Sequence, residues 1–233
     1  MKSSQAFNKR YFKKLPKGLI ILLFLFAAGI FLFAFITYEV IVERKDSFDN
    51  SILDYLSKNI MDPDLTDFME DITYFASSTF LEIAYGILVL IYALTKNWKR
   101  VIEIAFIGLG GFLVNYFMKL SFHRIRPPHP LLDPLTNFSF PSGHATSGFI
   151  FYGILAFLVW KTKIPQMYKY MVGFAFIAFS ILIGFSRVYL RMHYPSDVLA
   201  GFCIGFAWLF ITIGLFERLK KKTNKEIILS KNT

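Results

Sequence analysis

The chain has 233 residues, of which 55% are apolar and 18% aromatic, and its mean hydropathy is positive. This composition argues against an ordinary soluble domain. The net charge of +10 would suit a nucleic-acid-binding protein, but the positions of the charges indicate another class.

Six apolar blocks predict six membrane-spanning helices. Each block approaches the roughly 20 residues that cross a bilayer core, or reaches that length with its flanks. The blocks are residues 18–42, 74–94, 101–120, 147–160, 171–185 and 198–215. We expect an all-α, polytopic membrane protein in which residues 1–233 form a single domain.

The basic residues indicate how these helices are oriented. Lys and Arg gather in the N-terminal tail (six), in residues 96–100 (three), in residues 161–169 (three) and from residue 218 onward (six). All four segments lie on one side of a six-span layout, whereas residues 43–73, on the other side, hold nine acidic and three basic residues. Because basic loops stay in the cytoplasm, we expect both termini inside and residues 43–73 outside the plasma membrane. Anionic lipid is then a better partner than nucleic acid for the basic segments.

The outer loop contains apolar residues at a four-residue spacing. They predict a short amphipathic helix lying on the membrane surface, which could cover a site or only connect the first two spans. These residues are Phe48, Ile52, Leu56 and Ile60.

Three polar segments, far apart in the sequence, fall at the outer ends of predicted helices. Residues 119–127 follow the third span, residues 141–144 open the fourth, and residues 186–197 join the fifth to the sixth. Counting the crossings from a cytoplasmic N-terminus puts all three outside. They are therefore expected to share one pocket.

Local backbone chemistry predicts where two helices begin. Pro195 suits the first helical position, which puts His193 just before the sixth helix and Asp197 in its first turn. A carboxylate there is favoured by the helix dipole and can accept a hydrogen bond from an imidazole. Ser142 can cap the fourth helix, and Gly143 allows a ligand close to the backbone. Two helix N-termini aimed at one place favour an anion.

Several cations are expected around that place, with only Asp133 and Asp197 as nearby acids. Such cations repel one another unless a multiply charged anion enters, and phosphate matches both guanidinium forks and a lysine point charge. The cations are Lys119, Arg126 and Arg187, with Arg124 and Arg191 as further candidates.

Two histidines make a reaction possible. One imidazole could attack phosphorus after a carboxylate has fixed its tautomer, while the other protonates the leaving oxygen. The pairing with Asp197 favours His193 as the nucleophile and leaves His144 as the acid. Few carboxylates lie near the cations and no two cysteines exist to pair, so we expect no metal site and no cofactor.

At these positions the chain resembles the type 2 phosphatidic acid phosphatase superfamily. The matching pattern is Lys119 with six residues before Arg126-Pro127, then Pro141-Ser142-Gly143-His144, then Ser186-Arg187 with His193 and Asp197 following. The resemblance implies a metal-independent phosphatase that forms a phosphohistidine on His193, oriented by Asp197, with His144 as acid and later as base. It also implies that phosphate is held by Lys119, Arg126 and Arg187, with Ser142 and the Gly143 amide assisting.

Membrane members of this family act on lipid phosphates. The resemblance to small bacterial forms favours undecaprenyl diphosphate on the outer leaflet, with phosphatidylglycerol phosphate or phosphatidic acid as the alternative, because the signature does not distinguish lipid tails. The soluble vanadate-dependent haloperoxidases of the superfamily do not fit six spans. A lipid transporter or a non-catalytic partner of wall-synthesis enzymes would need the cations but no oriented imidazole. The expected partners are a lipid phosphate and the bilayer, and the oligomeric state stays open.

Other polar residues near the pocket have simpler interpretations. His123 and His129 are expected to be loop residues. Tyr189 and Arg191 could contact a headgroup or anchor a loop. For Glu82, near the middle of the second span, an interhelical hydrogen bond is favoured over a functional role.

Overall fold

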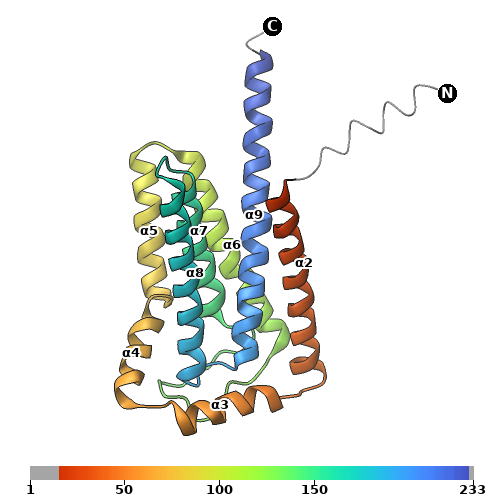
Figure 1. Cartoon of the computed structure of the whole chain (residues 1–233), viewed down its shortest axis with the longest axis vertical. Coiled ribbons are helices and arrows are strands. Elements are labelled where there is room, and N and C mark those ends of the chain that lie inside the picture. Colours follow the sequence, from red (N-terminus) through yellow and green to blue (C-terminus); the bar gives the residue numbers. More distant parts are fainter. Residues whose placement is uncertain (1–15, 231–233) are drawn as a thin grey trace, which may run out of the picture.

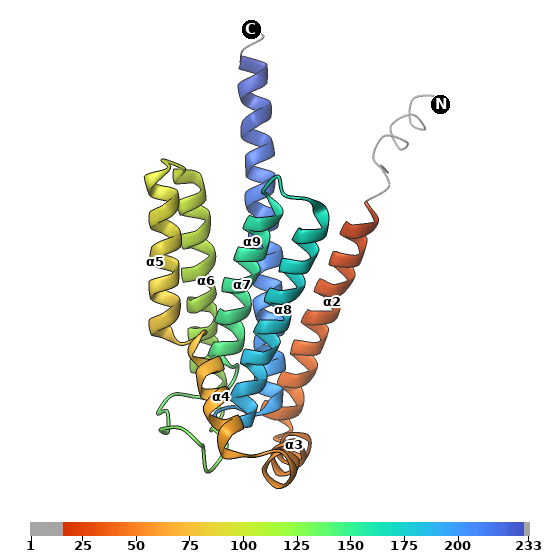
Figure 2. The same cartoon turned by 60° about the vertical axis from the view of Figure 1, so that its left-hand side comes forward.

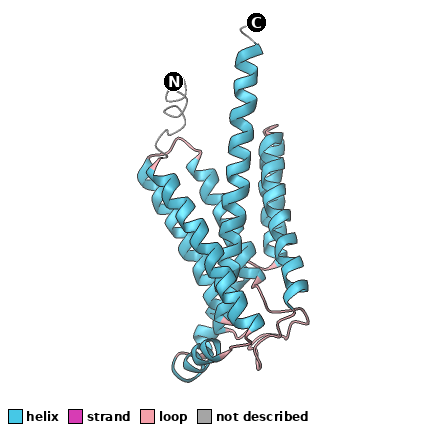
Figure 3. Ribbon diagram, turned by 90° about the vertical axis from the view of Figure 1, so that its right-hand side faces the viewer, coloured by secondary structure: helices cyan, strands magenta, loops and turns pink. Residues whose placement is uncertain are grey.

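The computed structural model describes residues 16–230, which fold into helices without any strand (Figures 1 and 3). Six helical stretches in this range are long and apolar enough to cross a membrane, as the six apolar blocks predict. The elements are α2 (Lys17–Thr37), the π-helical turn η1 (Tyr38–Val42), α3 (Ser47–Asn59), α4 (Pro63–Tyr74), α5 (Ser78–Leu94), α6 (Trp98–Phe122), α7 (Gly143–Trp160), α8 (Gln166–Tyr189) and α9 (Pro195–Ser230).

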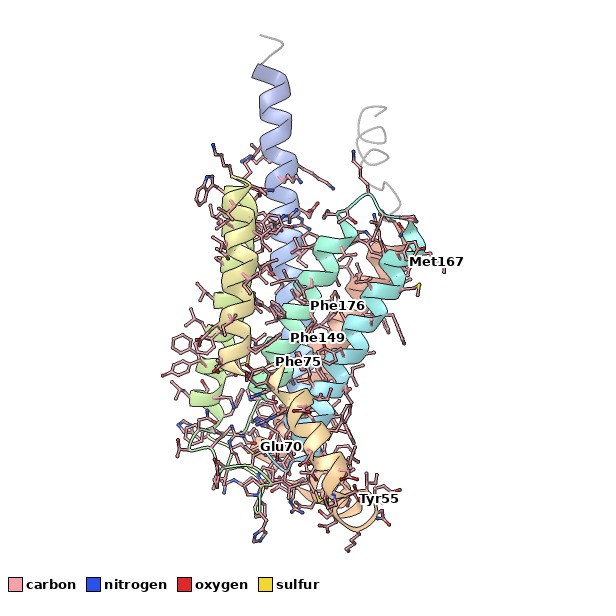
Figure 4. All side chains as sticks on the ribbon, turned by 90° about the vertical axis from the view of Figure 1, so that its left-hand side faces the viewer. Tyr55, Glu70, Phe75, Phe149, Met167 and Phe176 are labelled. Atoms are coloured by element: carbon pink, nitrogen blue, oxygen red, sulfur yellow. The ribbon has the colours of Figure 1, made fainter. Side chains whose placement is uncertain are left out.

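The long helices stand side by side, and α3 lies across one end of the bundle (Figure 1). The long connection between α6 and α7 lies at that same end (Figure 2). The start of α2 and the end of α9 lie at the opposite end (Figure 1). Apolar side chains project outward along the bundle, among them that of Met167 on α8, which is 69% exposed (Figure 4). Such a surface suits a hydrocarbon environment.

Close packing of α9 against the start of α7 brings two of the polar segments together. A Cβ atom at Gly201 would lie 2.9 Å from the carbonyl oxygen of Ser142, and one at Gly205 would lie 3.2 Å from that of Thr146. Only glycine allows the backbones to approach this far. Ile150 and Ile154 of α7 continue the contact toward α6 and α9 in a buried apolar cluster.

Two predicted helix starts are present in the structure. The hydroxyl of Ser142 accepts a hydrogen bond from the backbone N–H of Ala145 and caps α7, and α9 begins at Pro195. The second span differs from expectation, because it begins at Pro63 and is interrupted between Tyr74 and Ser78. Its first part, α4, is acidic on one face while its other face packs on α8. The acidic residues lower the hydropathy of this segment, so the apolar pattern of the sequence does not include it in the span.

Helix α3 packs most of its predicted apolar residues on the protein and buries one carboxylate beside them. Ile52, Leu56 and Ile60 lie in or against a buried apolar cluster, whereas Phe48 is 58% exposed and Asp49 is only 1% exposed. Leu53 and Leu56 are buried with it and pack against Ala145 of α7. The buried carboxylate of Asp49 therefore needs a cationic partner within the protein.

Candidate active site

The three polar segments meet at one cavity near the end of the bundle that carries α3. The cavity has a volume of about 770 Å³ and its polar end is lined by Lys119, Arg126, Gly143, His144 and His193. These residues come from α6, the α6–α7 connection, the first turn of α7 and the α8–α9 connection. The convergence expected from the sequence is therefore present for this set.

The remaining predicted site residues are buried next to the cavity. The carbonyl oxygen of Arg187 accepts the backbone N–H of His193, and that of Asp197 accepts the backbone N–H of Ser142. Ser142, Arg187 and Asp197 are each at most 2% exposed. All eight residues expected in the site thus lie in one connected region.

The hydroxyl of Ser139 stands between His193 and Asp197. Nδ1 of His193 and Oδ2 of Asp197 are 3.5 Å apart. Ser139 Oγ donates to Oδ2 of Asp197 at 2.5 Å and lies 3.3 Å from Nδ1 of His193. Because the serine proton is given to the carboxylate, Oγ accepts the proton of Nδ1, which leaves Nε2 unprotonated and able to act as an acceptor.

That unprotonated nitrogen faces the cations. Nε2 of His193 lies 3.2 Å from Nη1 of Arg126. The pKa of His193 is held well below its ordinary value by burial, and also by the positive charges of Arg126, Lys119 and Arg187. His193 is therefore a neutral imidazole at neutral pH, as a nucleophile must be.

The cations at the cavity are held by neutral groups rather than by carboxylates. Lys119 Nζ donates to the carbonyl of Phe138 at 2.5 Å, and Arg126 Nη1 donates to that of Met192 at 2.6 Å. Arg126 also donates through Nη2 to the side-chain oxygen of Asn137. Their charges are thus positioned without being neutralised.

Arg187 is similarly available. Its Nη1 donates to Thr73 Oγ1 at 2.9 Å, and its buried Nε has no hydrogen-bond partner among residues 16–230. A buried guanidinium nitrogen without a partner is costly, and an anion oxygen would remove that cost.

The two further candidates for phosphate contact are engaged elsewhere. Arg124 pairs with Asp46, Asp49 and Asp197. Arg191 donates to Ser57 Oγ and to the carbonyl of Pro128. Of the two acids expected near the cations, Asp197 is present and Asp133 is exposed, while Asp46 and Asp49 of the α3 region were not expected.

One helix N-terminus faces the cavity, rather than the two that were expected. Gly143 and His144, in the first turn of α7, line it. At the start of α9, the backbone N–H of Ser196 donates to Asp49 at 2.9 Å and is no longer free for a ligand. An acidic residue of α3 thus occupies the position where an anion was expected.

Two polar residues of the site were missed in the sequence. Asn115 lies one turn before Lys119 on α6, lines the cavity and donates to Thr146 Oγ1 at 3.1 Å. Ser139 lies two residues before Pro141. The four-residue spacing on α6 is a signal that could have revealed Asn115, whereas the role of Ser139 depends on the fold of the connection.

The other polar residues have distinct positions. His123 ends α6 in a left-handed conformation and packs on Phe138, and His129 is exposed in the connection, as expected of loop residues. The buried Tyr189 bonds through its hydroxyl to Asp62, so it anchors the start of α4. Glu82 lines the cavity and, among the described residues, makes no hydrogen bond, so the expected interhelical bond is not formed.

The cavity continues from the polar end into an apolar groove between α5 and α6. It extends along α6 from Lys119 to Ile104, about 22 Å at 1.5 Å per residue, with Gly86 and Val89 on the α5 side. A hydrocarbon chain fits such a lining. Within residues 16–230, no three His, Cys, Asp or Glu side chains gather as metal ligands.

The chain is similar in sequence to known proteins over much of its length. Residues 100–221 match the model of the PAP2 superfamily. The chain is 33% identical over 171 residues to phosphatidylglycerophosphatase B of Bacillus subtilis, covering 71% of this chain and 82% of that protein. It is 29% identical over 147 residues to the undecaprenyl-diphosphatase BcrC of the same organism, covering 59% of this chain and 70% of that protein.

One solved structure is similar over most of its length. The PAP2-type phosphatidylglycerolphosphate phosphatase of Bacillus subtilis superposes with a TM-score of 0.75 at 29% identity, covering 83% of this chain and 96% of that one.

Proposed function

The chain belongs to the PAP2 superfamily and is a membrane lipid phosphatase. From this premise we propose that it hydrolyses a lipid phosphate or diphosphate through a phosphohistidine on His193, without a metal ion. The observation that carries the proposal is the neutral imidazole of His193, whose Nε2 faces cations that have no carboxylate partners.

The first half-reaction transfers the phosphoryl group to the protein. Lys119, Arg126 and Arg187 hold the phosphate oxygens, with the start of α7 behind them. Nε2 of His193 attacks phosphorus and forms an N–P bond while the P–O bond to the lipid breaks. His144 gives its proton to the departing lipid oxygen.

The second half-reaction restores the protein. His144, now neutral, takes a proton from water, the water oxygen attacks phosphorus, and the N–P bond breaks to release inorganic phosphate. Asp197 acts through Ser139 to keep the proton on Nδ1 of His193 and to stabilise its positive charge while it is phosphorylated.

The site is proposed to face the outside of the plasma membrane. It lies at the end of the bundle opposite to the end of α9, where the basic residues Lys220, Lys221 and Lys222 lie. Basic segments stay in the cytoplasm, so the end with α3 is assigned to the outer surface. On this assignment α3 lies at the level of the lipid headgroups.

Two lipid classes are supported as substrates. The greater identity and coverage of phosphatidylglycerophosphatase B favours phosphatidylglycerol phosphate, whereas the resemblance to small bacterial forms of the family favoured undecaprenyl diphosphate. The likeness to BcrC keeps undecaprenyl diphosphate as the second candidate. Both present a phosphate attached to a long hydrocarbon, which suits the groove.

A parallel assay tests the proposal. Purified protein is given phosphatidylglycerol phosphate, undecaprenyl diphosphate or phosphatidic acid in EDTA, and released phosphate is measured. We expect hydrolysis of at least one lipid, its abolition in His193→Ala, and no change in His129→Ala, whose histidine is exposed. A requirement for a divalent metal, or full activity in His193→Ala, would refute the mechanism.

A further inference from the structure

Arg124 joins the carboxylate beside His193 to the surface helix α3. Its Nη1 donates to Oδ1 of Asp197 at 2.7 Å. Its Nη2 donates to Oδ2 of Asp49 at 2.7 Å and to Oδ1 of Asp46 at 2.6 Å. The side chains of Arg124 and Asp49 are 7% and 1% exposed. This guanidinium is thus buried among carboxylates and is not directed at the phosphate cavity.

Ser196 closes the same network from the first turn of α9. Its hydroxyl donates to Oδ2 of Asp49 at 2.5 Å and its backbone N–H donates to Oδ1. Arg124 Nη1 in turn donates to Ser196 Oγ at 2.7 Å, and the ring of Tyr194 lies 4.2 Å from the centre of the guanidinium. A buried network in which these groups satisfy one another fixes their positions.

The apolar contacts of α3 reach the same place. Leu53 and Leu56 pack against Ala145 and Val198, which directly follow His144 and Asp197 in the sequence. Helix α3 therefore packs against the residues that directly follow both an expected acid and an expected orienting carboxylate.

Both oxygens of the Asp197 carboxylate are held. Oδ1 accepts from Arg124, while Oδ2 accepts from Ser139 and from the backbone N–H of Tyr194 at 2.9 Å. Loss of the guanidinium would leave Oδ1 buried without a charged donor and free the carboxylate to rotate. Lysine could supply the charge, but not two donors that reach Asp197 and Asp49 together.

Resting on the proposed function, we propose that Arg124 is a positioning residue that fixes Asp197 for its action on His193, and that Asp49 makes helix α3 part of the catalytic apparatus. Arg124 acts through Asp197 and does not contact the phosphate. Residues outside the family signature then determine how well the signature residues are oriented.

The test compares Arg124→Gln, Arg124→Lys and Asp49→Asn in the full-length purified protein. Ser57→Ala is the matched control, because it removes a bond between α3 and Arg191 at a distance from Asp197. We expect Arg124→Gln to lower kcat at least about tenfold with KM changed less than about twofold, because small errors of position are costly in catalysis. Arg124→Lys should recover part of kcat, and Ser57→Ala should match the wild type.

Inhibition by two anions separates positioning from general damage. Orthovanadate adopts the five-coordinate geometry of phosphoryl transfer, so its inhibition should weaken in Arg124→Gln by about the factor lost in kcat. Inhibition by inorganic phosphate should stay unchanged, because the cations of the cavity are intact. If inhibition by the two anions weakens equally in Arg124→Gln, the inference is overturned.

A double variant separates a loss of catalysis in Arg124→Gln from a loss of thermal stability. Arg124→Gln combined with Asp49→Asn removes a buried charge of each sign and should recover the thermal stability lost in the single variant, while kcat stays low. Recovery of kcat together with stability would show that the network is only structural. A wild type that hydrolyses none of the lipids would refute the proposed function, whereas an active wild type matched by Arg124→Gln would refute this inference alone.

Discussion

Nδ1 of His193 and Oδ2 of Asp197 lie 3.5 Å apart, with the hydroxyl of Ser139 in contact with both. The carboxylate therefore orients the imidazole mainly through an intermediate hydroxyl group. This arrangement fixes the proton on Nδ1 through the hydroxyl of Ser139.

Ser139→Ala should lower kcat about tenfold or more, because the proton of Nδ1 loses its acceptor and the reactive tautomer is no longer fixed. KM should change little, since Ser139 holds no phosphate oxygen. Steady-state kinetics measures both values. The control is Ser180→Ala on α8, which removes another buried serine hydroxyl away from the cavity. An unaltered kcat in Ser139→Ala would contradict the bridging role.

The acid limb of the pH profile should lie below the ordinary histidine range. The lowered pKa of His193 keeps its imidazole neutral until the pH falls well below 6.5, so kcat/KM is lost only there. Arg126→Gln removes a nearby positive charge, which raises the pKa of His193 and moves the acid limb to higher pH. The profile of kcat/KM against pH measures the shift, and Arg191→Gln serves as the control. A limb that stays in place in Arg126→Gln would show that another group controls it.

Thr73→Val should weaken phosphate binding. The substitution keeps the shape of the side chain but removes the oxygen that holds Nη1 of Arg187 at 2.9 Å. We expect the inhibition constant of inorganic phosphate to rise about tenfold or more, in line with a lost hydrogen bond to a charged group of about 1.5 to 3 kcal/mol. Thr212→Val on α9 removes a similarly buried hydroxyl away from the site and should have no such effect. Equal inhibition constants of inorganic phosphate in Thr73→Val and Thr212→Val would contradict the role of Thr73.

Gly86→Phe should block long lipids selectively. A Cβ atom at Gly86 meets no atom of the described chain within 4 Å, so a phenyl ring can enter the groove without backbone strain. Hydrolysis of long-chain lipid phosphates should fall, while that of a short-chain, water-soluble phosphatidic acid stays near the wild-type rate. Gly173→Phe, at an equally open position on α8, is the control. An equal loss of hydrolysis rate on the long-chain and the short-chain substrate would show that the groove does not hold the hydrocarbon.

The sequence predicted those features that depend on local chemistry. Ser142 and Pro195 mark helix starts by their own capping and backbone preferences, and the six apolar blocks mark the spans by length. Counting the crossings of the spans also brought His144, His193 and Lys119 to the same expected pocket, and the cavity lining includes all three.

The sequence did not predict features that depend on tertiary contacts. Asp49 occurs among polar residues of a surface helix, and its burial follows only from the position of Arg124 after α6 ends. Arg124 itself was indistinguishable from the phosphate-facing cations until its partners were known. The start of the second span at Pro63 was hidden because α4 is acidic on its exposed face.

The central claim is tested most directly by trapping the phosphorylated protein. Wild-type protein is mixed with a lipid carrying a ³²P-labelled terminal phosphate, quenched within milliseconds, and digested under alkaline conditions. We predict a label that is stable to base and labile to acid, located on the peptide that contains His193 and absent from His193→Ala. A label on any other residue, or a burst of released lipid without a labelled protein, would contradict the account.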